Sequence, residues 1–376
     1  GGTPCPAIAQ DLSGELDVAV HAVQAATRLC LQVAGTMVVS PASEVPVGAT
    51  VSAESAVPGK TVVKDDHTPV TALDFAIQGL IAATLEQKFP GDRFMGEEDA
   101  KDLRADAGLC EMALSLARRE QLDMDQDLFL AAVDRGTQLS CEEPIGTRTW
   151  VLDPIDGTKG LVTGREYAIG LALVVDGEAI VSVMGNPSKH PDPCIMAAVK
   201  GQGLRFFDSL GPRDAPPRPH STFDLDTWTP DEDPAGASPV PWLLSRPIAR
   251  GSPLPFGPAA APQELCCGAM VKYWAVAVGD AAGFIQFDNE LNTWDHAAGV
   301  LCVQESGGCV RDAAGNPVRC FEDRTFHVDT SIICVSKESS PSVLSRLTDA
   351  VISEALLLKK MGTASSVGGG VGWNGD

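Results

Sequence analysis

A short acidic turn, Asp153-Pro154-Ile155-Asp156-Gly157-Thr158, carries the residues best suited to chemistry. It follows the bulky apolar residues 150–152, which predict a buried strand that stops at an acid, a proline and a glycine turn. Two carboxylates and the Ile155 carbonyl between them offer hard oxygens at one strand end, and magnesium prefers such ligands. Gly157 lets a ligand approach the backbone closely, and the amides of Gly157 and Thr158 suit a phosphate if a helix begins there.

Two acids elsewhere in the chain extend this set of oxygen ligands. Glu97 follows the end of a predicted helix, and Asp295 lies in the run 294–299, which opens another. If both converge with Asp153 and Asp156, the four carboxylates must take up protons, splay apart or share a cation. For Asp153, Asp156 and Glu97 taken alone, a solvated position in a turn or loop is the ordinary alternative. The sequence therefore predicts a metal site, provided that the segments meet.

Four segments, taken in order, resemble those of a known family. They are 64–74 (KDDHTPVTALD), 96–98 (GEE), 153–160 (DPIDGTKG) and 294–299 (WDHAAG). They look like the signature segments of the magnesium-dependent, lithium-sensitive phosphatases related to inositol monophosphatase. The lysine and glycine after DPIDGT, and the long stretch before it, are similar to the 3'(2'),5'-bisphosphate nucleotidase branch. The run Cys266-Cys267-Gly268 resembles a plant organelle-type member of that branch.

The resemblance implies a site and a reaction. It implies that two or three Mg²⁺ ions are held by Glu97, Asp153, the Ile155 carbonyl, Asp156 and Asp295. It implies substrate contacts at Gly157, Thr158, Lys159, Lys272 and Asp295. Asp74 and Thr158 match the pair that orients and deprotonates the attacking water, so no covalent enzyme intermediate is expected. For Asp74 alone, a first-turn acid favoured by the helix dipole is the open alternative.

Three neighbouring residues have open roles. Lys272 lies in an apolar run, and a buried cation requires an anionic partner. The resemblance implies that this partner is a phosphate of the nucleotide. Trp294 we interpret as core packing rather than substrate stacking. His296 is either a group behind the site or helix surface, without a catalytic role.

The segments expected to recognise the substrate depart from the nucleotidase pattern. Ala269 and Gln286 stand where the resemblance implies a serine and an arginine, and 243–253 lack the histidine-serine segment of that branch. Losing an arginine that meets a phosphate costs about 1.5 to 3 kcal/mol if nothing replaces it. Arg246 and Arg250 are the candidates to replace it.

Three functions remain in competition. The leading hypothesis is hydrolysis of the 3'-phosphate of adenosine 3',5'-bisphosphate to AMP, with activity on its sulfated relative left open. The second is an inositol polyphosphate 1-phosphatase or inositol monophosphatase activity. The third is a non-catalytic sensor of nucleotide or redox state, against which the pair Asp74 and Thr158 argues, because a binding module needs no water activator.

Apolar spacing and capping residues predict the elements that position these groups. A helix of some twenty residues is expected after Ser13, a hairpin or loop at 38–63, and a helix capped by Thr71 that places Asp74 in its first turn. One helix near 109–117 is expected between 98 and 148. Further expected elements are strands at 168–175 and 179–184, apolar segments at 270–278 and 283–287, a helix at 295–302, a strand at 331–335 and a helix at 343–357. The resemblance implies that they form a five-layer α/β/α/β/α sandwich.

We expect three parts along the chain. Residues 1–187 form an α+β domain with most metal ligands, 188–360 form an α/β domain with Asp295, and 361–376 form a flexible tail. Residues 208–262 hold about half of the 27 prolines and show little periodicity. This segment is therefore predicted to be a long irregular insertion rather than part of a domain core.

Composition limits the partners. The 376 residues, 44% of them hydrophobic, suffice for a large core, and no apolar run approaches the roughly 20 residues that cross a bilayer. With 28 basic and 50 acidic residues the net charge is −22, which argues against nucleic-acid polymers and anionic membranes. We expect a soluble monomer or weak dimer that binds a small phosphorylated nucleotide. Gly1 is not an initiator, so targeting is not visible; the resemblance favours a chloroplast or mitochondrion, with the cytoplasm as the alternative.

The eleven cysteines are predicted to be structural rather than redox-active. Cys30, Cys302 and Cys334 lie in apolar runs and suit small core positions. The adjacent pair Cys266-Cys267 is not expected to form a relaxed disulfide. Neither the cysteines nor the six scattered histidines suggest a zinc site.

Overall fold

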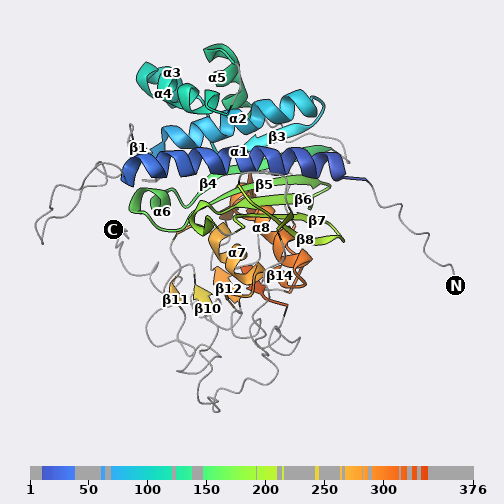
Figure 1. The fold of residues 1–376 in the computed structure, drawn as a ribbon. Helices are drawn as coiled ribbons and strands as arrows, with labels where there is room; N and C mark the ends of the chain where they lie inside the picture. The colour runs from blue at the N-terminus through green and yellow to red at the C-terminus, as the bar shows by residue number, and fades with distance from the viewer. Residues whose placement is uncertain are drawn as a thin grey trace, which may run out of the picture.

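The computed structural model describes most of the chain between residues 11 and 337 (Figure 1). The described residues are 11–38, 61–63, 69–120, 124–137, 147–191, 193–209, 214–215, 242–244, 263–264, 267–281, 283–286, 290–312, 315–319, 324–327 and 332–337. Helices and sheets alternate in layers through this part of the molecule (Figure 1).

The central layer is a seven-stranded sheet with the order β3-β4-β5-β6-β7-β8-β9. Its strands are β3 (Arg93–Gly96), β4 (Arg148–Asp156), β5 (Ala168–Val175), β6 (Glu178–Gly185), β7 (Ile195–Val199), β8 (Gly203–Phe207) and β9 (Asp214–Ala215). Only β3 and β4 pair in parallel; the other neighbours are antiparallel. Both faces of β5 are buried, as expected of a strand covered on both sides.

Two long helices cover one face of this sheet (Figure 1). They are α1 (Ser13–Val38) and α2 (Ala72–Lys88). Their apolar residues share a core with β5 and β6, including Val23, Ile77 and Val181. A smaller core lies on the other side of α2, where α3 (Lys101–Ala105), α4 (Ala107–Arg118) and α5 (Gln126–Asp134) pack. Because α2 is covered on both sides, its buried residues run all around the helix.

The other face of the sheet is covered by α7 (Met270–Ala277) and α8 (Thr293–Glu305). Beneath them lies a five-stranded sheet with the order β11-β10-β12-β16-β14. Its strands are β10 (Trp242–Leu244), β11 (Gln263–Glu264), β12 (Gly283–Gln286), β14 (Cys309–Asp312) and β16 (Ile332–Val335). One apolar core joins β5, both helices and this second sheet. Four layers of the expected sandwich are therefore described, and the helix expected at 343–357 lies outside the described residues.

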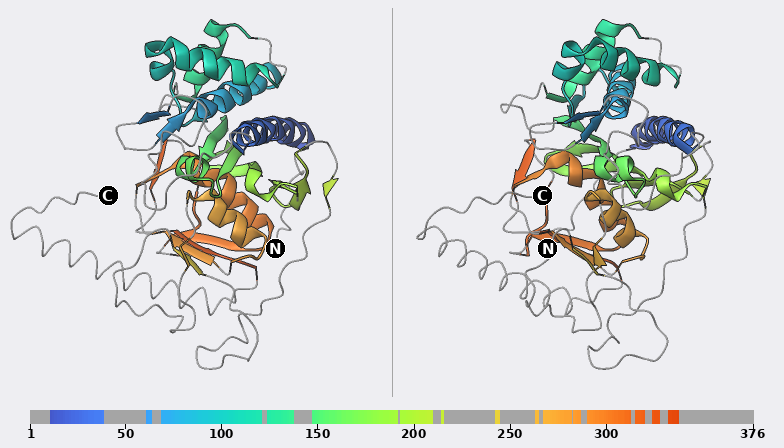
Figure 2. Two further views of the ribbon diagram at one scale, coloured as in Figure 1. Left: turned by 60° about the vertical axis from the view of Figure 1, so that its left-hand side comes forward. Right: turned by 90° about the vertical axis from the view of Figure 1, so that its left-hand side faces the viewer.

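Several short helices and strands accompany these layers, which two further views show from other sides (Figure 2). They are β1 (Thr61–Val63), β2 (Pro69–Thr71), η2 (Arg135–Thr137), α6 (Thr158–Thr163), η3 (Pro187–Lys189), β13 (Glu290–Asn292) and β15 (Thr325–His327). The antiparallel pair β13 and β15 leads directly into α8. None of the described helices is both long and apolar enough to span a membrane.

Most of the expected elements are confirmed. The helix after Ser13 is longer than expected, with 26 residues, and α2 begins directly after Thr71. The hairpin of β5 and β6 and the strand at β16 lie where they were predicted. The apolar segment at 270–278 is a helix, and the segment at 283–287 is a strand.

Two expectations about these elements were wrong. The segment between 98 and 148 holds α3 and α5 as well as α4. The helix α3 could not be predicted from periodicity, because it has five residues and one buried apolar residue, Leu103. The interpretation of 208–262 as an insertion outside the core misses β10, which pairs in the second sheet with β11 and β12. Three residues of strand are too few to show alternation among prolines.

The division into domains after residue 187 stays a prediction. The seven-stranded sheet continues past this point, since β7 pairs with β6 from Val181↔Val199 to Gly185↔Ile195. A boundary at 187 would therefore separate two strands of one sheet. Residues 38–60 and the tail from 338 lie outside what the structure describes, apart from Val38 in α1.

Candidate active site

The two acids of the 153–158 turn lie on one face of β4 because the strand contains a bulge. Side chains three residues apart in a regular strand point to opposite faces. Here Asp153 pairs with Gly170 and Asp156 with Ala168, so three residues of β4 oppose two of β5. The extra residue falls beside Pro154, which has no amide to donate to a sheet. The strand thus runs on to Asp156, and the expectation that it stops at Asp153 was wrong.

This face of β4 looks toward α7 and α8. Gly170, the partner of Asp153, has no room for a side chain: a Cβ there would overlap the Met270 side chain and approach the Ala298 Cβ to 3.4 Å. Directly paired residues of antiparallel strands project to the same face. The carboxylate of Asp153 therefore emerges between the sheet and the two helices.

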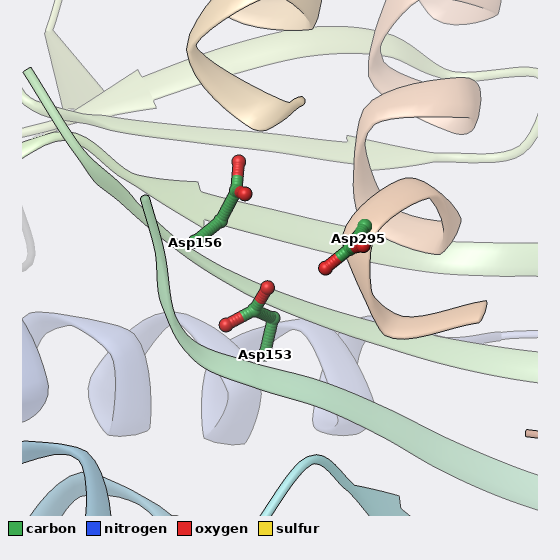
Figure 3. A group of neighbouring side chains, drawn as sticks. All are labelled: Asp153, Asp156 and Asp295. Atoms are coloured by element: carbon green, nitrogen blue, oxygen red, sulfur yellow. The ribbon is translucent and has the colours of Figure 1, made fainter. Parts of the chain in front are cut away.

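Asp295 reaches the same place from the first turn of α8. Figure 3 shows its carboxylate facing those of Asp153 and Asp156, two from the strand and one from the helix. Ligand oxygens of these three residues lie within 4.8 Å of one another. The condition set by the sequence, that the segments meet, is therefore fulfilled for three of the four acids; Glu97 is not in this group, and the metal site itself stays a prediction.

Burial and mutual repulsion raise the pKa values of the three carboxyls. Burial is the main cause for Asp153, whose pKa lies well above its usual range, with Glu97, Asp156 and Asp295 adding to the rise. Burial, Asp156 and Glu97 raise the pKa of Asp295 to about 8. Asp153 and Asp295 also share a hydrogen bond, which two carboxyls form only when one is protonated. Without a cation, the fold therefore holds these groups partly protonated.

The donor set fits a hard divalent cation. Oδ1 of Asp153 is buried and accepts no hydrogen bond from the donor groups of the described residues. A buried oxygen without a partner carries a large desolvation cost, which a cation among the three carboxylates would offset. All ligands in the group are oxygens, which favour Mg²⁺, Ca²⁺ or Mn²⁺ over softer metals.

Asp156 is fixed by the start of α7. Its carboxylate accepts hydrogen bonds from the amides of Ala269, at 3.1 Å, and Met270. Gly268 makes this approach possible: it has φ +91°, and a Cβ there would overlap the carboxylate. These contacts lower the pKa of Asp156, but burial outweighs them and raises it to about 6.

Lys272 lies one turn further along α7 and is only 5% exposed. Its ammonium donates to the Gly268 carbonyl. Burial lowers its pKa, while the charges of Asp156 and Asp295 oppose that fall. The anionic neighbours predicted for this lysine are therefore the acids of the site in this structure.

Glu97 lies beside the three acids in the turn after β3. Its charge raises the pKa values of Asp153, Asp156 and Asp295, so its carboxylate is within electrostatic reach of all of them. The turn is anchored by Gln78 of α2, which is fully buried. The side-chain oxygen of Gln78 accepts a hydrogen bond from the backbone amide of Glu98 at 2.9 Å, and its Nε2 donates to the Glu98 carbonyl at 2.7 Å.

The remaining predicted residues lie at the starts of α2 and α6. Asp74 is buried in the first turn of α2, and its charge contributes to the raised pKa of the Cys30 thiol, about 12, which is due mainly to burial. Thr158 is buried at the start of α6 and donates to the Ile155 carbonyl at 3.3 Å. Gly157 precedes it with φ +87°, and Lys159 is exposed. These placements do not test the roles expected for them.

A family model with the description "Inositol monophosphatase family" matches residues 21–352. The chain belongs to the inositol monophosphatase family. It is 28% identical to 3'(2'),5'-bisphosphate nucleotidase 1 of Candida albicans, covering 89% of this chain and 95% of that protein. It is 30% identical to a putative mitochondrial 3'(2'),5'-bisphosphate nucleotidase of Arabidopsis thaliana, covering 83% of this chain and 80% of that protein.

Several solved structures share the fold. The Thermotoga maritima IMPase superposes with a TM-score of 0.55 at 18% identity, covering 90% of this chain and 99% of that one. The extragenic suppressor protein suhB of Bartonella henselae has a TM-score of 0.53 at 19% identity. The layered α/β sandwich expected from the sequence is therefore the fold of this chain, with four of its five expected layers among the described residues, and metal dependence agrees with the buried acidic group.

Several residues around this inositol monophosphatase-type site have roles that sequence reasoning missed or left open. Gln78 is not among the predicted site residues, because its position four residues after Asp74 is unremarkable in the sequence and only the structure shows that it is fully buried. His296 is fully buried and its Nδ1 lies 3.0 Å from the Tyr273 hydroxyl, which excludes helix surface, one of the two alternatives left open. Trp294 is 8% exposed and packs in the core, as predicted.

The cysteines follow the prediction where the structure describes them. Cys30, Cys302 and Cys334 are free and buried, as are Cys110 and Cys194. Cys267, next to Gly268, is disulfide-bonded. Burial raises the pKa of the Cys302 and Cys334 thiols, which keeps them in the unreactive thiol form.

Proposed function

We propose that the chain is a Mg²⁺-dependent phosphomonoesterase that removes the 3'-phosphate of adenosine 3',5'-bisphosphate, giving AMP and phosphate. The observation that carries this proposal is the convergence of Asp153, Asp156 and Asp295 within 4.8 Å in a buried position. The names of the relatives from Candida albicans and Arabidopsis thaliana support the substrate. The fold alone does not select it, because one fold hosts many substrates.

The proposed ligands are Glu97, Asp153, the Ile155 carbonyl, Asp156 and Asp295, which would hold two or three Mg²⁺ ions. Bound there, the ions would neutralise phosphate charge, stabilise the leaving alkoxide and acidify a water molecule. The protein's own contribution is to hold the oxygens in place. Asp156 is held by the amides of α7, and Asp153 by the bulge in β4.

Asp74 and Thr158 are the proposed pair for water activation. The Thr158 hydroxyl donates to the Ile155 carbonyl, which leaves its oxygen lone pairs able to accept a hydrogen bond from water. In our proposal the hydroxyl turns toward Asp74 when it passes the proton on. The burial of Asp74, which is 1% exposed, suits a base that must accept a proton.

Substrate contacts are proposed for Gly157, Thr158, Lys159, Lys272 and Asp295. Gly157 and Thr158 begin α6 and would meet the departing phosphate. Lys159 is exposed and free to reach a second phosphate of the substrate. Lys272 would act from α7, by offsetting the negative charge of Asp156 and Asp295. Gln286 on β12 replaces an expected arginine, so a weaker grip on the nucleotide is part of the proposal.

Compartment and assembly enter only as proposals. The Arabidopsis relative named as mitochondrial supports an organelle location. A monomer or weak dimer stays the expectation for the oligomeric state.

One substrate panel tests the proposal. Purified protein with Mg²⁺ is offered adenosine 3',5'-bisphosphate, its sulfated relative, inositol 1-phosphate and inositol 1,4-bisphosphate, and phosphate release is measured. The proposal expects the highest kcat/KM for adenosine 3',5'-bisphosphate and AMP as the product. Turnover confined to an inositol phosphate would refute the substrate and keep the chemistry. Metal binding without turnover of any ester would favour the sensor.

A further inference from the structure

Arg324 stands between the two parts of the chain that supply Glu97 and Asp295. It lies directly before β15, which pairs with β13, the strand that leads into α8. Its guanidinium is half-buried and extends toward the turn after β3. No sequence motif discussed above includes this residue.

Its side chain binds three backbone carbonyls on the Glu97 side. Nη1 donates to the Gly96 carbonyl at 2.9 Å and to the Gly136 carbonyl at 2.6 Å. Nη2 donates to the carbonyl of Glu97 itself, at 3.2 Å. Through these charge-assisted hydrogen bonds, Arg324 links the Glu97 turn to η2 and to the segment before β15.

The same residue is anchored to α8 on the Asp295 side. Its carbonyl accepts a hydrogen bond from the Thr293 amide, at the first residue of α8, at 2.8 Å. Its guanidinium carbon lies 4.5 Å from the ring centroid of Trp294. Trp294 immediately precedes Asp295, so both contacts fix the turn of helix that carries this acid.

We propose that Arg324 is a positioning residue, which sets the distance between Glu97 and the three acids around Asp295. The proposal rests on the proposed function, because it assumes that these acids hold metal. Asp153 and Asp156 share one strand and need no such device. Glu97 and Asp295 belong to separate elements, and Arg324 contacts the backbone of both segments.

Arginine suits this task better than lysine. Its planar fork presents several donors at fixed angles and stays charged at any relevant pH, whereas an ammonium is a flexible point charge. A fork can hold three carbonyls and stack on an indole at once, as Arg324 does. Groups that orient metal ligands without touching the metal typically change metal affinity by about 10- to 100-fold when removed.

The test compares Arg324→Met, Arg324→Lys and Arg118→Met in the full-length chain. Arg118 is the matched control, since it also donates to a backbone carbonyl, that of Met124, but lies on α4 away from the acids. Each protein is stripped with EDTA and titrated with Mn²⁺ alone by calorimetry. We expect Arg324→Met to weaken Mn²⁺ binding on the order of tenfold or more, Arg324→Lys to fall between it and the wild type, and Arg118→Met to bind as the wild type does.

A second readout separates positioning from general destabilisation. At saturating Mg²⁺, Arg324→Met should recover most of the wild-type kcat, because the acids and the pair Asp74 and Thr158 remain. Unchanged Mn²⁺ affinity in both Arg324 variants would overturn the inference, and equal weakening in Arg118→Met would overturn it as well. A wild-type chain that binds no Mn²⁺ would overturn the metal site and this inference together. A wild type that binds Mn²⁺ but does not hydrolyse the nucleotide would refute only the proposed substrate, and the variant affinities would still decide the role of Arg324.

Discussion

Replacing Asp295 by asparagine should stabilise the metal-free protein at pH 8 and destabilise the protein with bound Mg²⁺, each relative to the wild type. The reason lies in the raised pKa of Asp295, about 8 against a usual value of 3.8. At pH 7 the unfolded chain carries this group as a carboxylate, so folding without metal must take up a proton. That uptake costs 1.36 kcal/mol for each pH unit above 3.8, or about 4 kcal/mol at pH 7. Because Asp295 keeps some solvent exposure, we expect a realised cost of about 2 kcal/mol.

The pH dependence follows from the direction of the shift. The pKa of Asp295 is higher in the folded state than in the unfolded state. Its contribution to the free energy of unfolding is therefore fully present below about pH 4 and is lost as the pH rises through about 8. Asp156, with a pKa raised to about 6, acts in the same direction. In EDTA the wild type should therefore lose stability between pH 5 and pH 8. Asp295→Asn should lose less, and at pH 8 it should be the more stable protein.

Saturating Mg²⁺ should invert this order. A ligand that binds only the folded state stabilises it by about 2.7 kcal/mol at a hundred times its Kd, and Asp295→Asn loses much of that gain. The assay is urea unfolding of both proteins at pH 5.5 and pH 8, each with EDTA and with Mg²⁺. Asp127→Asn serves as the control, because Asp127 is an exposed first-turn acid of α5. If Asp295→Asn is less stable than the wild type in EDTA at pH 8, the account of the acidic group is wrong.

Three further variants test other parts of the site. Asp74→Asn should lower kcat at least about 100-fold while Mn²⁺ binding, measured by calorimetry, stays close to that of the wild type; an unchanged kcat would remove Asp74 from the mechanism. Lys272→Met should move the acidic limb of the plot of kcat against pH to higher pH, because Lys272 lowers the pKa of Asp156. An acidic limb that moves to lower pH or does not move would contradict the placement of Lys272 beside Asp156. Gly268→Ala should abolish Mn²⁺ binding, since a Cβ there overlaps the Asp156 carboxylate. Gly315→Ala, at φ +84° with open space around it, measures the cost of left-handed backbone alone, and equal effects of the two changes would reject the steric argument.

The acids of the site were predictable from sequence because chemistry limits where such residues occur together. Asp153 and Asp156 come at the end of the apolar run that forms β4, and Asp295 lies in the first turn of a helix, so the element that carries each acid indicates its position. The hairpin of β5 and β6 was equally plain, from two apolar runs joined at Asp176-Gly177. Such signals are local, and the structure confirms them.

What the sequence did not reveal depends on contacts between distant segments. The bulge that aligns Asp153 with Asp156 exists only because β5 provides the opposing register. The anchoring of the Glu97 turn depends on Gln78, and the contacts of Arg324 reach Gly96, Glu97 and Gly136. A glutamine in a helix or an arginine before a short strand has no distinctive neighbour in the sequence. Their roles therefore became visible only with the fold.

The site is built so that backbone contacts, rather than partners of opposite charge, hold the acids together. Asp156 is held by two amides of α7, Glu97 by a turn fixed from both sides, and Asp153 by the bulge of its strand. Lys272 is the buried cation shown beside them, and its pKa is itself lowered by burial. The fold thus accepts a cluster whose charges repel, which raises the pKa values of its members. A divalent cation relieves that repulsion, so metal affinity and the instability of the metal-free protein have the same physical origin.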